Sequence, residues 1–229
     1  MSDKKNKILI VDDEEDLCEI IQFNLNGEGY DTDVASSAEA VLKMDLSLYK
    51  LILLDVMMGQ ISGFKLADIL RKELKLSVPI IFITAKTTEN DLLTGFSLGA
   101  DDYITKPFSI KELTARVKAV LGRSKTQNYQ PDQVLKIEDV ELNFNKKELI
   151  IKGQIIRLTR KEFEILNLLM GNPDRIFSRE EILRTVWEDD IIVTDRTIDV
   201  HISRLRKKMN EHGEYLKNKA GYGYCFDYS

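Results

Sequence analysis

The feature that most constrains the fold is a regular alternation, over residues 1–122, between short apolar runs and amphipathic segments. Runs that are apolar throughout are typical of strands buried on both faces of a sheet. Strands are expected at 7–11, 31–35, 51–54, 80–83 and 102–105. Helices are expected at about 17–27, 37–44, 63–73, 89–98 and 109–122. Five strand–helix units of this length predict an α/β fold with a five-stranded, doubly wound parallel sheet.

The pattern changes after residue 122. Residues 123–133 (RSKTQNYQPDQ) are polar and contain a proline, so we interpret them as a linker between a domain at 1–122 and a second at 134–229. Four short β runs follow, at 134–137, 141–143, 148–151 and 155–158. Three helices are then expected, near 160–171, 178–187 and 195–210, before a hairpin at 215–227. This order predicts an α+β winged helix-turn-helix domain.

The two halves differ in charge. Residues 1–122 carry 14 Lys and Arg against 20 Asp and Glu, whereas residues 123–229 carry 19 against 18. The acidic half is not expected to bind nucleic acid by itself. Residues 195–210 hold five basic and two acidic side chains, which form a positive stripe.

The two cysteines, Cys18 and Cys225, lie far apart and form no CxxC motif, so we expect reduced thiols. No apolar stretch approaches the roughly 20 residues that span a bilayer. The N-terminus does not follow the pattern of a signal peptide. The sequence therefore predicts a soluble cytoplasmic protein with no membrane partner.

Polar side chains stand where the expected strands end. Asp12 and Asp13 follow the first strand, Asp55 the third, Thr84 the fourth and Lys106 the fifth. The carboxyl ends of parallel strands meet at one edge of a sheet, so these side chains should converge. Clustered carboxylates repel one another unless a cation joins them, and oxygen ligands of this kind suit Mg²⁺. With a lysine and a hydroxyl opposite, the arrangement predicts an aspartyl phosphoacceptor site with Asp55 as nucleophile.

The segment 195–210 divides by helical period. Ile198, Ile202, Leu205 and Met209 form one apolar face. A basic helix with such a face is either a solvated surface helix or a helix that docks in the DNA major groove, where arginine grips guanine edges or phosphates. On the second interpretation, the candidate DNA contacts are Arg196, Thr197, Val200, His201, Ser203, Arg204, Arg206 and Lys207.

Residues 7–122 resemble the receiver domain of two-component systems, a CheY-like fold. The motifs KILIVDDEEDL, LILLDVMMGQISGF, PIIFITA and GADDYITKPF carry the resemblance. It implies that Asp55 is the phosphoacceptor, that Thr84 and Tyr103 are switch residues and that Lys106 binds the phosphate. It also implies a cis Lys106–Pro107 peptide. The implied Mg²⁺ ligands are Asp12, Asp13, Asp55 and the Met57 carbonyl.

Receivers of the OmpR/PhoB type dimerise through their last two helices and the strand between, and the residues that match this interface are Asp101, Asp102, Glu112 and Arg116. Leu92 stands where a basic residue would face Glu112, which removes one ion pair. Gly59 and Ser62 stand where the family usually has Pro and Asp, which loosens the loop after Asp55.

Residues 134–226 resemble the winged-helix domain of the same family. The motifs are LTRKEFEILNLLM, FSREEILRTVW, DRTIDVHISRLRKKM and GYGYCF. The resemblance implies a recognition helix at 195–210 and a wing at 217–224, with Lys217 and Lys219 as phosphate contacts. Ala220 replaces the wing arginine, and Ser203 replaces an arginine found in some relatives. Base readout should therefore rest on fewer side chains than usual.

Together these features predict a phosphorylation-dependent transcription regulator rather than an enzyme, with only slow self-phosphorylation and self-dephosphorylation. The implied partners are a sensor histidine kinase, double-stranded promoter DNA, RNA polymerase and a second copy of the chain. Two alternatives stay open. One is a constitutive DNA-binding protein that uses the receiver as a dimerisation scaffold. The other is a Mg²⁺-dependent phosphatase, which Met57 disfavours because such enzymes carry an acid at that position. No Gly-rich loop follows the first strand, so a flavin or dinucleotide binder fits poorly.

Overall fold

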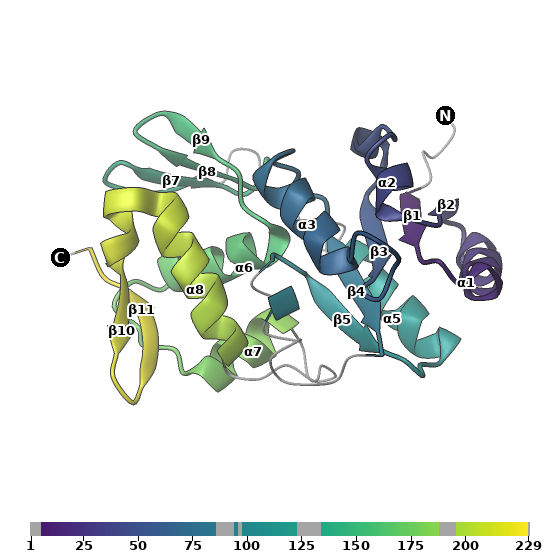
Figure 1. Cartoon of the computed structure of the whole chain (residues 1–229). Coiled ribbons are helices and arrows are strands. Elements are labelled where there is room, and N and C mark those ends of the chain that lie inside the picture. The colour runs from purple at the N-terminus through teal and green to yellow at the C-terminus, as the bar shows by residue number, and fades with distance from the viewer. Residues whose placement is uncertain (1–5, 86–93, 96–97, 123–133, 188–195, 229) are drawn as a thin grey trace. The chain divides into compact units, whose positions relative to one another are not determined.

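The computed structural model describes residues 6–85, 94–95, 98–122, 134–187 and 196–228 (Figure 1). The chain separates into two compact units, residues 1–127 and 128–229. The predicted linker at 123–133 lies outside the described residues, so its boundaries stay a prediction.

The first unit contains the predicted five-stranded parallel sheet, with strand order β2-β1-β3-β4-β5. Its strands are β1 (Lys7–Val11), β2 (Asp31–Ala35), β3 (Leu51–Asp55), β4 (Ile80–Thr84) and β5 (Asp102–Thr105). Its described helices are α1 (Glu15–Gly27), α2 (Ala38–Val41), α3 (Gly63–Lys72) and α5 (Ile110–Gly122), with a 3₁₀ turn, η1 (Leu46–Leu48). α2 is shorter than the predicted 37–44. Most of the predicted helix at 89–98, including Leu92, lies outside the described residues.

The central strands are buried on both faces, as their apolar runs predicted. Every residue of β3 and β4 is buried. One face of the sheet shares a core with α1 and α5, in which Ile21 and Val117 are fully buried. On the other face, Phe64 of α3 packs edge-on against Phe82, with ring centroids 5.1 Å apart. Helices on both faces fix the sheet and leave its carboxyl edge open for a site.

The second unit begins with an antiparallel sheet, in the order β6-β7-β8-β9. Its strands are β6 (Val134–Ile137), β7 (Val140–Asn143), β8 (Glu148–Ile151) and β9 (Gln154–Ile156). The helices are α6 (Arg160–Met170), α7 (Arg179–Trp187), α8 (Arg196–Met209) and the 3₁₀ helix η2 (Asn210–Tyr215). The hairpin β10 (Leu216–Lys219) and β11 (Gly223–Phe226) closes the chain. This is the predicted winged-helix arrangement (Figure 1).

Local sequence signals explain where the helices begin. At α3, Ser62 accepts a hydrogen bond from the Lys65 N–H at 3.3 Å, so the serine that replaces the usual Asp still caps the helix. α6 begins with a capping box, in which Thr159 and Glu162 each accept from the other's backbone N–H. In the part of the chain that the structure describes, no helix is both long and apolar enough to cross a bilayer.

Candidate functional site

The structure brings three carboxylates together at the carboxyl edge of the parallel sheet. Asp12 and Asp13 follow β1, and Asp55 ends β3. One oxygen from each lies within 4.8 Å of the other two. Asp12 and Asp55 are each 2% exposed, whereas Asp13 is exposed. The cluster therefore has two buried members and one that faces water.

Lys106 is the cation that the described residues place beside this cluster. Its Nζ lies 2.9 Å from Asp12 Oδ2, 3.3 Å from Asp55 Oδ1 and 2.7 Å from Glu14 Oε1. Burial alone would lower the pKa of Lys106, but hydrogen bonds to Glu14 and Asp12 and the charge of Asp55 raise it above its usual range. The lysine is therefore a permanent cation.

Glu14 was missed by sequence reasoning, although it directly follows the Asp12–Asp13 pair and its carboxylate binds Lys106.

The Lys106–Pro107 peptide is cis, as the resemblance implied. The backbone N–H of Lys106 also donates to the Thr84 carbonyl at 2.7 Å, so the ends of β4 and β5 are joined beside the cluster.

The electrostatics favour a positive ligand. Burial is the largest cause that raises the pKa of Asp55; the charge of Lys106 lowers it and that of Asp12 raises it further, with a net rise. The carboxylates of Asp12, Asp13, Glu14 and Asp55 outnumber the ammonium of Lys106. Three carboxylate oxygens at this spacing are a donor set that fits Mg²⁺, a hard cation that prefers oxygen ligands and keeps some of its waters.

The two predicted switch residues lie inside the domain. Thr84, at the end of β4, is 0% exposed, and Tyr103 in β5 is 5% exposed. The Tyr103 ring packs against Phe82 at 5.8 Å between centroids. A Cβ added at Gly95 would come within 2.8 Å of the Tyr103 ring, so the ring lies directly against the backbone there. The Met57 side chain is exposed; the predicted role concerns its backbone carbonyl.

The backbone of Asp55 is held by a close approach of α3. A Cβ built at Gly63 would stand 2.0 Å from the Asp55 carbonyl oxygen. The Gly63 N–H donates to the Val56 carbonyl at 3.1 Å. Gly63 is therefore required because any side chain would push α3 away from the end of β3.

Two of the predicted dimer residues, Asp101 and Asp102, lie inside the domain in this structure. Asp101 and Asp102 are 1% and 3% exposed and pair within the chain. Asp101 Oδ2 accepts from the Ile80 N–H at 3.0 Å and lies 3.7 Å from Arg71 Nη2. Asp102 lies 3.2 Å from Arg116 Nη1. These ion pairs join β5 and its N-terminal neighbour to α3 and α5, and a role of the two carboxylates in a dimer stays a prediction.

Arg116 also pairs with Glu112, one helical turn away, at 3.0 Å. The Arg116 side chain is 12% exposed and that of Glu112 is 41% exposed. Of the four predicted dimer residues, Glu112 is therefore the one whose side chain the structure presents to solvent.

In the second unit, the apolar face of α8 is the predicted one, since Ile198, Ile202, Leu205 and Met209 are all fully buried. The outward stripe is narrower than predicted. Its exposed members are Arg196, Ser203 and Lys207, with partly buried Val200 between them. Their spacing of four, three and four residues places them on one helical face.

Thr197 and His201 are corrected as DNA contacts, because they are 1% and 0% exposed. The His201 ring packs on Trp187 with centroids 5.3 Å apart. Burial lowers the pKa of His201 to about 3, so the imidazole is neutral. The helical period assigned both residues to outer faces, but α8 is buried over more than a narrow stripe, and Trp187 of α7 covers it at His201.

Arg204 and Arg206 are also engaged inside the domain. Arg204 Nε lies 3.2 Å from Glu162 Oε1, and Arg206 Nε donates to the Leu216 carbonyl at 3.0 Å. Glu162 is 0% exposed and also binds Lys208, 2.6 Å away. Sequence reasoning missed Glu162 as an anchor, although the Thr159–Glu162 capping signature was visible; its partners lie over 40 residues away.

The two wing lysines differ in their burial and in their ion pairs. Lys217 is partly buried on β10, and Lys219 pairs with Asp227 at 3.2 Å with its side chain 43% exposed. Both lie on the hairpin, as the resemblance implied.

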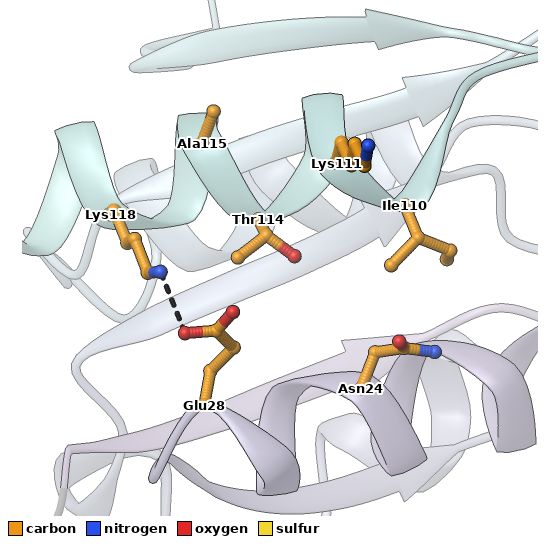
Figure 2. Close-up of a pocket in the computed structure, with 7 residues that line it drawn as sticks. All are labelled: Asn24, Glu28, Ile110, Lys111, Thr114, Ala115 and Lys118. Atoms are coloured by element: carbon orange, nitrogen blue, oxygen red, sulfur yellow. Dashed lines mark ion pairs between the residues drawn. The ribbon is translucent and has the colours of Figure 1, made fainter.

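A separate cavity of about 360 Å³ lies between α1 and α5. Figure 2 shows its lining: Asn24, Glu28, Ile110, Lys111, Thr114, Ala115 and Lys118. The Lys118–Glu28 ion pair, at 2.6 Å, closes one end. None of the acidic-cluster residues lines it, so it is separate from that cluster.

Comparison with known proteins defines the class. Residues 8–118 match the response regulator receiver domain, and residues 153–226 match the C-terminal domain of transcriptional regulatory proteins. A receiver joined to a DNA-binding domain is a response regulator, a class of transcription regulators rather than enzymes.

Full-length relatives then identify the family. The chain is 38% identical to the phosphate regulon transcriptional regulatory protein PhoB of Rhizobium meliloti, over 96% of this chain and 98% of that protein. It is 40% identical to the alkaline phosphatase synthesis transcriptional regulatory protein PhoP of Bacillus subtilis, over 95% of each. The crystal structure of DrrB, an OmpR/PhoB homolog of Thermotoga maritima, matches with a TM-score of 0.52 and 31% identity, over 97% of this chain and 99% of that one. The chain belongs to the OmpR/PhoB family of two-component response regulators.

Proposed function

We propose that Asp55 accepts a phosphoryl group from a sensor histidine kinase and that this reaction controls DNA binding by the second domain. The observation that carries the proposal is the convergence of Asp12, Asp13 and Asp55 with Lys106 at one edge of the sheet. Its excess of negative charge suits a divalent cation, and Lys106 supplies the positive charge that an added phosphoryl group needs.

Mg²⁺ would be held by Asp12, Asp13, Asp55 and the Met57 carbonyl, where it would offset the charge of the phosphoryl oxygens. The Asp55 carboxylate attacks phosphorus in line, forming an O–P bond as the P–N bond to the donor histidine breaks. Lys106, now held by Asp12, Asp55 and Glu14, binds a phosphoryl oxygen. Met57 offers no acid for hydrolysis at its position, so self-dephosphorylation is slow.

The phosphoryl group then shifts the conformation of Thr84 and Tyr103. The phosphoryl group shifts this equilibrium only to the extent that it interacts more favourably with the active conformer than with the inactive one. The shift promotes pairing of two protomers, with Glu112 at the surface. Paired DNA-binding domains bind adjacent half-sites of promoter DNA and act on RNA polymerase in the cytoplasm. The proposed DNA-facing side chains are Arg196, Val200, Ser203, Lys207, Lys217 and Lys219.

The test is intact mass after incubation with Mg²⁺ and acetyl phosphate, with size-exclusion chromatography on the same samples. Wild type should gain one phosphoryl group and move toward a dimer, and Asp55→Asn should do neither. The Asp16→Asn variant is a matched control, because Asp16 lies in the first turn of α1 outside the cluster. A phosphoryl group that persists on Asp55→Asn would refute Asp55 as acceptor. DNA binding that is identical in wild type and Asp55→Asn under these conditions would instead support the constitutive binder.

A further inference from the structure

The cavity between α1 and α5 is formed by residues that recur at helical spacing on both helices (Figure 2). Asn24 and the C-cap residue Glu28 lie one turn apart on α1, and Ile110, Thr114 and Lys118 lie on successive turns of α5. Both helices contribute to the same apolar core of the receiver. The walls of the cavity are therefore held in place by the packing of the domain.

Thr114 gives this cavity a buried hydrogen-bonding group. The residue is 8% exposed, and its hydroxyl has no hydrogen-bond partner among the residues that the structure describes. Figure 2 shows the side chain on the face of α5 that is turned toward α1. Buried hydroxyl groups normally have a partner, so the Thr114 hydroxyl is available to a molecule that enters the space between the two helices.

The charge of the lining is positive, in contrast to that of the domain. Residues 1–122 carry 20 Asp and Glu against 14 Lys and Arg, whereas two lysines and one glutamate line the cavity. Glu28 pairs with Lys118, and Lys111 has no carboxylate partner in the described part of the chain. α5 begins at Ile110, so the positive end of its helix dipole lies beside Lys111. The uncompensated positive charge favours an anion.

The lining also favours a small ligand over a protein segment. Helices that dock in a groove do so through a continuous apolar stripe. Of the seven residues that line this cavity, only Ile110 and Ala115 are apolar. The volume of about 360 Å³ lies within the range of small-molecule sites.

We propose that the α1–α5 cavity binds a small organic anion. Lys111 attracts its carboxylate or phosphate group as a point charge, and the Thr114 hydroxyl donates a hydrogen bond to it. One N–H of the Asn24 amide donates to the Ile20 carbonyl at 2.7 Å, which leaves the second N–H for the ligand. The apolar body of the ligand lies against Ile110. None of the acidic-cluster residues lines this site, so it is separate from the proposed phosphorylation chemistry.

The experiment follows the Ile110 δ1-methyl signal of the full chain by NMR, with ¹³C-labelled isoleucine methyl groups. The signal is assigned by its loss in Ile110→Val. The probes are benzoate, phenyl phosphate and benzamide, an uncharged match of benzoate. Mg²⁺ and phosphodonors are left out, so the result does not depend on phosphorylation. Both anions should shift the signal saturably with a dissociation constant of about 1 mM, and benzamide should bind at least about fivefold more weakly.

Two substitutions in the lining should weaken benzoate binding. Lys111→Gln removes the charge and should weaken it about threefold. Thr114→Val removes the hydroxyl at nearly constant shape and should weaken it about fivefold, whereas Thr114→Ser keeps a hydroxyl and should stay within about twofold of wild type. Lys65→Gln removes an exposed lysine of α3 outside the cavity and is the matched control. Thermal melting checks that each variant is folded.

Three results would each overturn the proposal. The first is the absence of a saturable shift with either anion at ten times the expected dissociation constant. The second is wild-type affinity for benzoate in both Lys111→Gln and Thr114→Val, which would place the anion elsewhere. The third is equal binding of benzoate and benzamide, because the charge of the ligand would then have no effect. Phosphorylation of Asp55 is measured separately by intact mass, so failure of this site and failure of the proposed function are distinguishable.

Discussion

Each domain buries a carboxylate beside basic side chains, yet the pKa values of these two carboxyl groups are shifted in opposite directions. Asp55 is 2% exposed and its pKa is raised, because burial outweighs the charge of Lys106, a lysine also bound by Asp12 and Glu14. Glu162 is 0% exposed, and burial favours its neutral form too. The charges of Lys208 and Arg204 and the Thr159 N–H nevertheless hold the pKa of Glu162 below its usual range.

The difference separates a binding site from a structural anchor. At Asp55, several carboxylates share one ammonium, so a bound cation would stabilise the site. At Glu162, two cations and a backbone N–H satisfy one carboxylate, so nothing further is needed and the contact fixes α8 on α6. Burial of a carboxylate therefore does not by itself distinguish a binding site from a structural anchor. The number of positive partners around the carboxylate distinguishes the two.

The largest expected effect tests the anchor. Glu162→Gln leaves Arg204 and Lys208 without their counter-charge and should lower the free energy of unfolding by about 4 kcal/mol. Urea denaturation followed by tryptophan fluorescence checks this, because the chain's single tryptophan, Trp187, lies in the same domain and is 1% exposed.

The matched control for that variant is Glu180→Gln in the same domain. Glu180 pairs with Arg184 at 2.5 Å, with its side chain 65% exposed, and its loss should cost less than about 1 kcal/mol. Equal effects of the two substitutions would remove the contrast drawn between Asp55 and Glu162.

The next effect concerns how Asp55 is positioned, which depends on backbone packing and not on a charge partner. Gly63→Ala introduces a Cβ that would stand 2.0 Å from the Asp55 carbonyl oxygen, so it should cost the receiver about 3 kcal/mol and slow phosphorylation by acetyl phosphate. Gly59→Ala in the same loop is the control, since a Cβ there meets nothing within 4 Å. Circular dichroism melting and intact-mass kinetics measure both, and normal kinetics for Gly63→Ala would show that α3 can move freely.

A third prediction concerns the pH dependence of stability, which His201 should cause in the domain that contains Glu162. His201 has a folded pKa of about 3, below the unfolded value of about 6.5, so it is neutral in the fold and its burial is tolerated above pH 6.5. As pH falls below 6.5, only the unfolded chain gains the proton, and stability should drop by about 2 kcal/mol by pH 5. Urea titrations of Trp187 fluorescence at pH 7.5 and 5.0 should show a smaller loss for His201→Gln. The same loss in both proteins would assign the pH dependence to other groups.

The smallest effect tests the charge imbalance at Asp55. Mg²⁺ at ten times its dissociation constant should stabilise the receiver by about 1.4 kcal/mol. The melting temperature should rise by roughly 5 °C in wild type and far less in Asp55→Asn. The Trp187 transition of the second domain should not move, because Glu162 is already satisfied. A shift of both transitions, or of neither, would contradict the proposed cation site.

Much of the site was predictable because strand order and strand ends follow from local patterns. The apolar runs at 7–11, 51–54 and 80–83 predicted buried strands, and the residues directly after them had to share one edge. Asp12, Asp13 and Asp55 do so, with Lys106 beside them. The apolar face of α8 followed equally from its period.

Helical period could not predict how much of α8 is covered. It assigned Thr197 and His201 to outer faces, but both side chains are buried. It also could not show that Arg204 binds Glu162 or that Arg206 donates to the Leu216 carbonyl. Likewise, the family resemblance that marked Asp101 and Asp102 as interface residues could not show that their carboxylates are buried and pair with Arg71 and Arg116.

The sequence by itself determined the order of the elements, the two domain types and the acidic edge of the sheet, because hydrophobic periodicity and chain direction are local properties. Only the tertiary structure decided which charges face solvent and which are satisfied internally. The reason is physical: the pKa of a carboxylate, and the freedom of a basic side chain to meet DNA, depend on burial and on partners brought together from distant parts of the chain.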